Sequence, residues 1–105
     1  MNKLLSTFSL CKKAGKLVLG FDAVKQSVMD GQACAVFTTR DLSLKTKKEI
    51  SYFCEKAKTV RQDLPLTMED MEKINKRKSG VLSVTEKGLA AKIMEIVNRR
   101  DEEGM

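Results

Sequence analysis

The chain has 105 residues, of which 20 are Lys or Arg and 14 are Asp or Glu, so its formal net charge is +6, and it has no histidine. This length favours one domain, 1–105, and an apolar content of 42% with a single proline excludes a disordered tail. The missing histidine excludes histidine-based acid–base catalysis, histidine-dependent triads and histidine-containing metal sites.

The positive charge is unevenly placed along the chain. Residues 1–48 hold nine basic and three acidic residues, whereas residues 49–105 hold eleven of each. A surplus confined to the first half favours a polyanionic partner such as nucleic acid, with a general gain in solubility as the alternative.

The cysteines and the hydropathy indicate the compartment. Cys11, Cys34 and Cys54 are odd in number and form no C-x-x-C motif, so we expect three buried, reduced thiols. Each apolar run is too short to span a membrane or to serve as a signal peptide. We therefore expect a cytoplasmic protein that makes no membrane contact.

Apolar spacing predicts the elements of the first half. Leu4, Leu5, Phe8 and Cys11 recur at helical spacing, which predicts a helix over 2–14 that Ala14-Gly15 ends. A short strand follows over 16–19. Gly20 breaks that strand, and a second helix runs to about Asp30 with Val24, Ser27 and Val28 on its inner face.

The continuous apolar run 33–38, which includes Cys34, predicts a central strand covered on both faces. After a loop at Arg40, Ser43 caps a third helix, whose apolar stripe is formed by Ile50, Phe53, Cys54 and Ala57. The early exposed face of this helix carries Lys45, Lys47 and Lys48, which oppose the helix dipole.

The second half continues the alternation. Residues 59–61 predict a short strand, and Thr67 with Asp70 resembles a capping box that opens a brief helix with Met68, Met71 and Ile74 on its apolar side. A basic loop over 76–80 precedes a strand over 81–85. Thr85 is expected to cap a last helix with a stripe of Leu89, Ile93, Ile96 and Val97, and the charged residues from Arg99 onward are expected to fray.

Strands that alternate with helices in this way predict an α/β fold, a three-layer α/β/α sandwich around a four-stranded mixed sheet. The sequence contains no phosphate-binding glycine loop and no nucleophile motif. We therefore expect a protein that is not an enzyme and that uses no metal and no cofactor.

Basic residues gather where strands and helices meet, at Lys16, at Arg40 and at Lys76 to Lys78. Ligands of alternating α/β folds bind where loops leave the carboxyl ends of strands. The helix that starts after Gly20 offers free backbone N–H groups to a phosphate or a base edge. Aromatic residues make up only 5% of the chain and include no tryptophan, so a stacking platform of the kind used by single-strand binders is not expected, and recognition of RNA by shape fits better.

The stretch 20–41, GFDAVKQSVMDGQACAVFTTRD, resembles the family of the archaeal ribosomal protein L-seven-Ae, and most closely its bacterial YlxQ-type members. The lead-in AGKLVLG, the segment DLSLKTKK and the late segment VLSVTEKGLA are also similar to that family, whereas 62–75 matches poorly. The resemblance implies the same sandwich fold and binding to structured RNA, typically kink-turns or ribosomal RNA.

The resemblance also implies which residues bind RNA. Kink-turn binders read Gly-x-Asn-Glu-x-x-Lys at the seven positions where this chain has Gly20, Phe21, Asp22, Ala23, Val24, Lys25 and Gln26. The glycine is kept, but Asp22, Ala23 and Gln26 replace the three side chains that bond sheared G·A pairs in the family. Each lost base contact costs about 1–3 kcal/mol of discrimination, and Lys25 is a partial substitute one position early.

A second family contact comes from the loop before the last strand, here Lys76, Arg77, Lys78 and Ser79. The resulting hypothesis is a monomeric RNA-binding protein, associated with the ribosome or another structured RNA. The alternative is a protein–protein interaction module on the same fold that has lost kink-turn recognition, with Met68, Met71 and Met94 as an adaptable surface.

Overall fold

The elements follow the predicted order of alternating helices and strands. The structure, a computed structural model, describes residues 3–103, with side chains through Arg99. Its helices are α1 Lys3–Lys13, α2 Phe21–Met29, α3 Leu44–Ala57, α4 Met68–Asn75 and α5 Lys87–Glu103. Its strands are β1 Leu17–Leu19, β2 Ala35–Thr38, β3 Val60–Asp63 and β4 Val81–Val84. Residue 2, predicted as the first helical residue, lies outside this range.

The strands form one mixed sheet in the order β1-β4-β2-β3. β4 runs antiparallel to both β1 and β2, and β2 runs parallel to β3. The predicted central strand is confirmed, because all four residues of β2 are buried, and β4 is equally buried beside it. Continuous apolar strands of this kind are covered on both faces.

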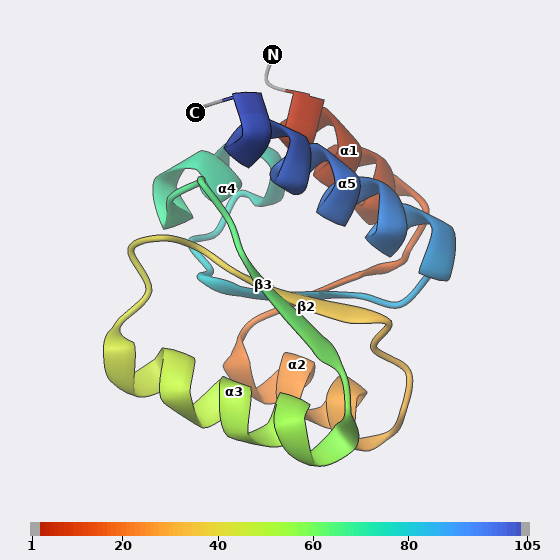
Figure 1. Cartoon of the computed structure of the whole chain (residues 1–105), viewed down its shortest axis with the longest axis vertical. Helices are drawn as coiled ribbons and strands as arrows, with labels where there is room; N and C mark the ends of the chain where they lie inside the picture. Colours follow the sequence, from red (N-terminus) through yellow and green to blue (C-terminus); the bar gives the residue numbers. More distant parts are fainter. Residues whose placement is uncertain (1–2, 104–105) are drawn as a thin grey trace.

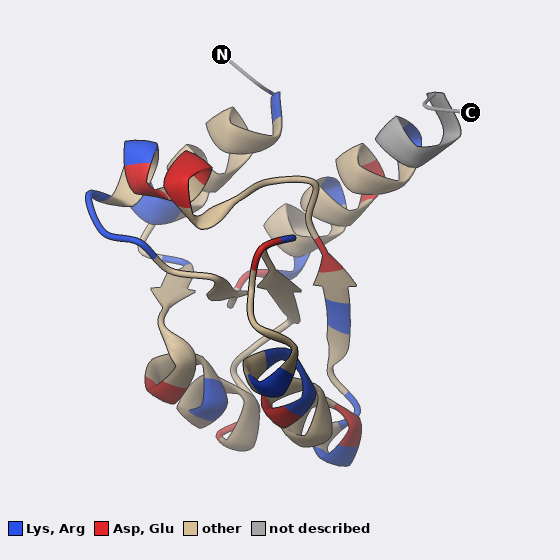
Figure 2. Cartoon of the chain, turned by 90° about the vertical axis from the view of Figure 1, so that its left-hand side faces the viewer, with Lys and Arg blue, Asp and Glu red and all other residues tan. Residues whose placement is uncertain are grey.

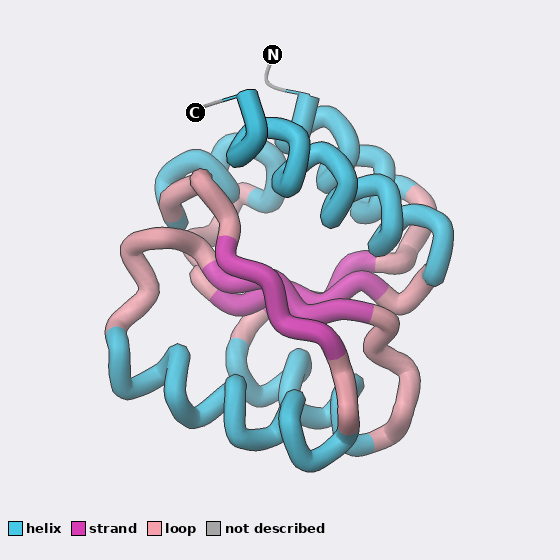
Figure 3. The backbone as a smooth tube through the Cα atoms, viewed as in Figure 1, coloured by secondary structure: helices cyan, strands magenta, loops and turns pink. Residues whose placement is uncertain are grey.

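Helices cover both faces of the sheet, which confirms the three-layer sandwich. α1, α4 and α5 lie on one side and α2 and α3 on the other (Figures 1 and 3). The first face buries Phe8 of α1 edge-on against Phe37 of β2, with ring centroids 5.6 Å apart. On the other face, the buried hydroxyls of Ser27 and Ser83 form a hydrogen bond of 2.9 Å.

Two predicted helix caps are confirmed and one is wrong. The Ser43 hydroxyl accepts a hydrogen bond from the Thr46 amide at the start of α3, and Thr67 forms a complete capping box with Asp70. Those hydrogen bonds from Thr67 hold the pKa of the Asp70 carboxyl below its usual range. The last helix is capped by Glu86, whose carboxylate accepts from the Gly88 and Leu89 amides.

Thr85 instead directly follows β4, and its amide donates to the Lys16 carbonyl. The fraying predicted from Arg99 is also not observed before Glu103, since α5 continues to that residue and Arg99 pairs with Glu95 at 2.7 Å. A helical (i, i+4) ion pair supports the last turns.

Several burial predictions are corrected. Cys34 is exposed because β2 begins one residue later, whereas Cys11 and Cys54 are buried as expected. Burial raises the pKa of the Cys11 thiol to about 11. Ala57 is exposed at the end of α3, so the apolar stripe of that helix ends at Cys54.

The three methionines named for the protein-interaction alternative do not form an exposed surface. Met71 is fully buried, and Met68 and Met94 are half-buried. Met71 and Met94 belong to the core between the sheet and the layer of α1, α4 and α5. One of the two features that motivated the protein-interaction alternative is therefore not observed; the other is the replacement of the family's kink-turn side chains by Asp22 and Ala23.

Candidate nucleic-acid interface

One end of the sheet brings together segments that are distant in the sequence. The Gly20 amide, just after β1, donates to the Val81 carbonyl at the start of β4 at 3.0 Å. The Thr39 amide, just after β2, donates to the Gly80 carbonyl, also at 3.0 Å. The start of α2, the loop after β2 and the loop before β4 therefore meet at this end, which we call the Gly20 end.

The first turn of α2 is open to an outside acceptor. Gly20 is its N-cap, with φ 95° and ψ 150°, and it supplies no side-chain cap. Phe21 is half-buried, whereas Asp22 and Ala23 are exposed. Since the amides of a first helical turn lack intrahelical partners, this turn presents donors to a phosphate or a base edge. Asp22 is the acidic residue of that turn.

The basic loop between α4 and β4 lies against this turn. Arg77 Nη2 is 3.3 Å from the position that a Cβ atom on Gly20 would occupy. Lys76 ends α4 in the left-handed conformation at φ 57°, and Lys76, Arg77 and Lys78 are all exposed. Arg77 therefore lies beside the open amides, and Lys76 and Lys78 are exposed on the same loop, an arrangement that favours an anion.

Ser79 and Gly80 hold this loop in place and do not face a ligand. Ser79 is buried, and its hydroxyl donates to the Val81 carbonyl at 3.0 Å. A Cβ atom on Gly80 would lie 2.7 Å from Leu42 Cδ1. Ser79, expected to touch RNA, is therefore placed as a support for the residues before it.

Arg40 lies in the loop after β2, exposed at the same end of the sheet. The Arg40 amide donates to the Leu66 carbonyl, and the Asp41 carboxylate accepts from the Met68 amide at the start of α4. The first bond fixes the backbone at Arg40, and the second gives the Asp41 carboxylate a hydrogen-bond partner within the protein. Figure 2 shows the basic loop after α4 and the lysine-rich first turns of α3 facing the same side of the molecule.

Three predicted residues are placed differently from the rest. Lys16 lies at the opposite end of β1, where its carbonyl accepts from Thr85, so the structure does not bring it to the Gly20 end. The Lys25 ammonium lies 4.5 Å from the ring centroid of Phe53, toward α3. Gln26 donates to the Asp30 carboxylate at 2.9 Å, further along α2.

Two buried polar side chains near this end were not predicted from the sequence. Thr39 Oγ1 and the Asn75 amide are buried without a hydrogen-bond partner among residues 3–103. Thr39 follows β2, and Asn75 ends α4 just before the basic loop. Buried unpaired polar groups are rare and follow from packing, so a sequence pattern gives no signal for them.

No group of three or more potential metal-ligating residues occurs within the described range. No helix in that range is long and apolar enough to cross a membrane.

Comparison of the sequence with protein-family models and with curated proteins gives no match. Solved structures do match. A Bacillus halodurans protein of unknown function is 23% identical with a TM-score of 0.85, and the match covers 93% of this chain and 99% of that one. The Giardia lamblia 15.5kD RNA binding protein is 16% identical with a TM-score of 0.74, and the match covers 94% and 85%. At these identities, the comparisons establish a shared fold.

Proposed function

We propose that the chain is a single RNA-binding domain, 1–105, that recognises structured RNA at the Gly20 end of its sheet. The observation that carries the proposal is the contact between Arg77 and the first turn of α2. Open backbone donors and three exposed cations lie together there, and this pairing suits a phosphate backbone and the base edges beside it.

Two further observations support RNA as the partner. The surplus of positive charge lies in the first half of the chain, which contributes α2, Arg40 and the start of α3. The fold is shared with a Giardia lamblia protein whose name describes it as RNA binding. Aromatic side chains are absent from the basic loop 76–80, so charge and shape dominate the proposed contact.

The finer proposal is a kink-turn-like or ribosomal RNA, bound by a cytoplasmic monomer that performs no catalysis. Asp22 and Ala23 lie exposed on the first turn of α2, where the family resemblance implies base-contacting side chains. Asp22 accepts hydrogen bonds but does not donate them, and Ala23 does neither. We therefore expect affinity driven mainly by phosphates, with reduced discrimination for a kink-turn.

The test is a titration of the full chain with a kink-turn RNA and with a straight duplex of equal length, at several salt concentrations. About five phosphate contacts would give a slope of log affinity against log salt near −4. Affinity that does not depend on salt, or no binding at low salt, would overturn the proposal.

Paired charge reversals locate the contact. Replacing Arg77 and Lys78 by Glu should abolish most of the binding. Replacing the exposed Lys87 and Lys92 of α5 by Glu is the matched control, because it changes the net charge equally on another element. Equal losses in both variants would show that binding follows net charge and not the Gly20 end.

A gain-of-function variant tests the kink-turn class. Asp22→Asn, Ala23→Glu and Gln26→Lys together restore the family's side chains on α2. We expect the ratio of kink-turn to duplex affinity to rise by at least tenfold, which is the equivalent of about one good base contact. An unchanged ratio would leave structured RNA of another kind as the ligand.

A further inference from the structure

A groove of ≈ 470 Å³ runs between the exposed sides of α2 and α3. Phe21 and Lys25 of α2 line it on one side, and Lys48, Glu49, Tyr52 and Phe53 of α3 line it on the other. Phe21 directly follows Gly20, so the groove starts beside the first turn of α2. An RNA strand that extends from the Gly20 end along α2 would therefore reach this groove.

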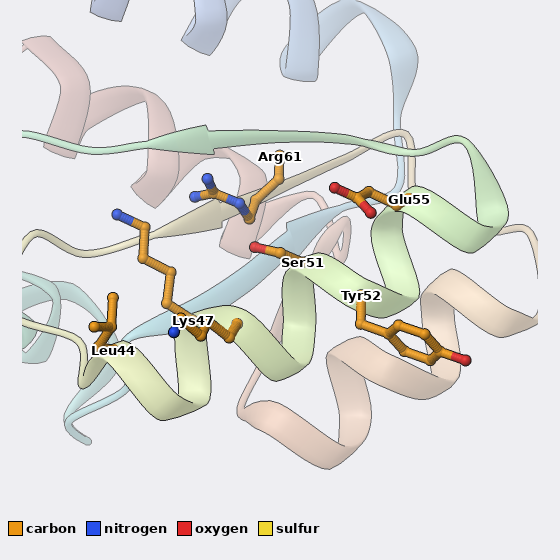
Figure 4. A pocket seen from close by; sticks show the side chains of 7 residues that line it. Leu44, Lys47, Ser51, Tyr52, Glu55 and Arg61 are labelled. Atoms are coloured by element: carbon orange, nitrogen blue, oxygen red, sulfur yellow. The ribbon is translucent and has the colours of Figure 1, made fainter.

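Tyr52 forms a ridge in this surface. Its side chain is 57% exposed, and its ring meets the Phe53 ring edge-on, with centroids 5.3 Å apart and planes at 79°. A second groove of ≈ 400 Å³, toward β3, shares Lys48 and Tyr52 with the first. Figure 4 shows Tyr52 pointing away from Lys47 of α3 and from Arg61, which belongs to β3.

Cations surround the two rings. The Lys25 ammonium lies 4.5 Å from the Phe53 centroid, and the Lys56 ammonium lies 5.8 Å from the Tyr52 centroid. Lys48 lines both grooves, and the acids are Glu49 in the first and Glu55 in the second. Lys47 is already paired with Asp63 at 2.9 Å, so its charge is balanced within the protein.

An exposed aromatic ring among ammonium groups suits a ligand that has both a π face and negative charge. An unpaired nucleotide has both, because its base stacks on a ring and its phosphate pairs with a cation. An apolar protein segment would use the rings but would not pair with the cations, since the three lysines Lys25, Lys48 and Lys56 exceed the two acids Glu49 and Glu55. Charge complementarity therefore favours nucleic acid over protein as the occupant.

We propose that this groove binds unpaired nucleotides, with a base stacked on Tyr52 and phosphates held by Lys25 and Lys48 of the groove and by Lys56 beside the Tyr52 ring. The source of those nucleotides rests on the proposed function, since they would flank the structured RNA at the Gly20 end. This proposal departs from the expectation, drawn from the low aromatic content, that the chain has no stacking platform, because one accessible ring, that of Tyr52, is sufficient for one base.

Tyr52 provides a direct readout, because the chain has one tyrosine and no tryptophan. Titration with an adenosine hexanucleotide should quench its emission as the base stacks. A ribose-phosphate hexamer without bases carries the same charge and should leave the emission unchanged. This arm reports on the groove whether or not structured RNA binds elsewhere.

The second arm measures the affinity of the chain for three forms of one hairpin RNA. The first carries an unpaired tail of five nucleotides, the second carries the same tail without its bases, and the third has no tail. Both the 5′ and the 3′ positions of the tail are tested. A tail with bases at one of these ends should tighten binding by about tenfold over the tail without bases, as expected for one stacked base.

Variants separate the contributions. Tyr52→Ala should remove the effect of the bases, and Tyr52→Phe should retain it. Leu10→Ala on α1 is the matched control, because Leu10 is 54% exposed and Tyr52 57%. Tailless RNA should bind all of these variants equally.

Each outcome bears on a different proposal. Failure of tailless RNA to bind overturns the proposed function, and quenching by the hexanucleotide still supports the groove. Equal binding of the two hexamers without quenching overturns stacking and leaves a charge contact only. Absence of any response from either hexamer overturns the groove proposal.

Discussion

Arg77 and Gly20 are in contact across the two loops of the Gly20 end: Nη2 of the arginine lies 3.3 Å from where a Cβ on the glycine would lie. Gly20 has φ 95° and ψ 150°, a conformation that is close to exclusive to glycine. The same residue therefore allows the turn into α2 and leaves room for the guanidinium. Backbone geometry and the position of a cation are coupled at this point.

Gly20→Ala should weaken folding and RNA binding together. The backbone at this position costs about 1–3 kcal/mol for a residue with a side chain, and the added methyl group, 3.3 Å from Arg77 Nη2, makes the guanidinium shift by a few tenths of an ångström. Gly31→Ala is the control, because Gly31 also has a positive φ, 76°, with no atom within 4 Å of the added Cβ. Both should unfold at lower urea concentration, and only Gly20→Ala should lose RNA affinity. Equal affinities would mean that Arg77 does not act through this contact.

Lys76→Gly should stabilise the fold while it weakens binding. Lys76 and Lys58 both end helices in the left-handed conformation, at φ 57° and 58°. Relief of that strain by glycine should raise the free energy of unfolding by about 0.5–1 kcal/mol in either variant. Only Lys76→Gly removes a cation from the basic loop, so it alone should reduce the salt slope by about one. A reduced slope in Lys58→Gly would count against this assignment.

Much of the fold follows from local patterns in the sequence. The helical spacing of Leu4, Phe8 and Cys11 and the capping box at Thr67 predict elements that the structure confirms, because neighbouring residues determine both. The errors occur at boundaries. The strand β4 ends at Val84, so the cap of α5 moves from Thr85 to Glu86, and β2 starts after Cys34.

The candidate site is less predictable because its geometry depends on pairing between strands. The sequence places Lys16 and Gly20 at the two ends of one short strand. The pairing with β4 then shows which residues lie beside each of them, Val81 beside Gly20 and Thr85 beside Lys16. The approach of Arg77 to Gly20 likewise depends on β1 pairing with β4. Tyr52 gives a sequence signal only as an aromatic residue outside the apolar stripe of its helix.

Asp63 should make stability depend on pH in acid. Desolvation alone would raise the pKa of this carboxyl, but hydrogen bonds from Lys47, Arg61 and Thr38 outweigh it and lower the pKa to about 2. A lowered pKa in the folded state stabilises the protein above pH 4, and that stability is lost as the pH falls toward 2. Since the side chain is 53% exposed, the contribution should be below about 1 kcal/mol.

Urea denaturation of the wild type and of Asp63→Asn measures this contribution. The wild type should be more stable than the variant at pH 7, and the difference should shrink as the pH approaches 2. A difference that stays constant over this range would show that the ion pairs of Asp63 do not stabilise the fold.

Cys34 should be the one reactive thiol among three in the folded protein. It is exposed, whereas Cys11 and Cys54 are buried and burial raises their pKa values. Its amide donates to the Val84 carbonyl, at the end of the sheet opposite Gly20. A thiol reagent should therefore label one site under native conditions and three in denaturant, and the label should leave RNA affinity unchanged. Rapid labelling of a second native thiol would contradict the burial of Cys11 and Cys54.

Asn75 should link the stability of α4 to the basic loop. It is 8% exposed, and neither polar atom of its amide has a partner within residues 3–103. An unpaired buried amide costs about 1–3 kcal/mol, so Asn75→Leu, similar in size, should raise the free energy of unfolding by about 1 kcal/mol. Asn75→Asp should lower it, because a buried charge is harder to accommodate than an amide. A loop that moves on binding and gives the amide a partner would make Asn75→Leu weaken RNA affinity as well. Urea denaturation of both variants measures the change in stability. Calorimetric titration with RNA measures the change in affinity. A loss of stability in Asn75→Leu would show that the amide already has a partner in solution.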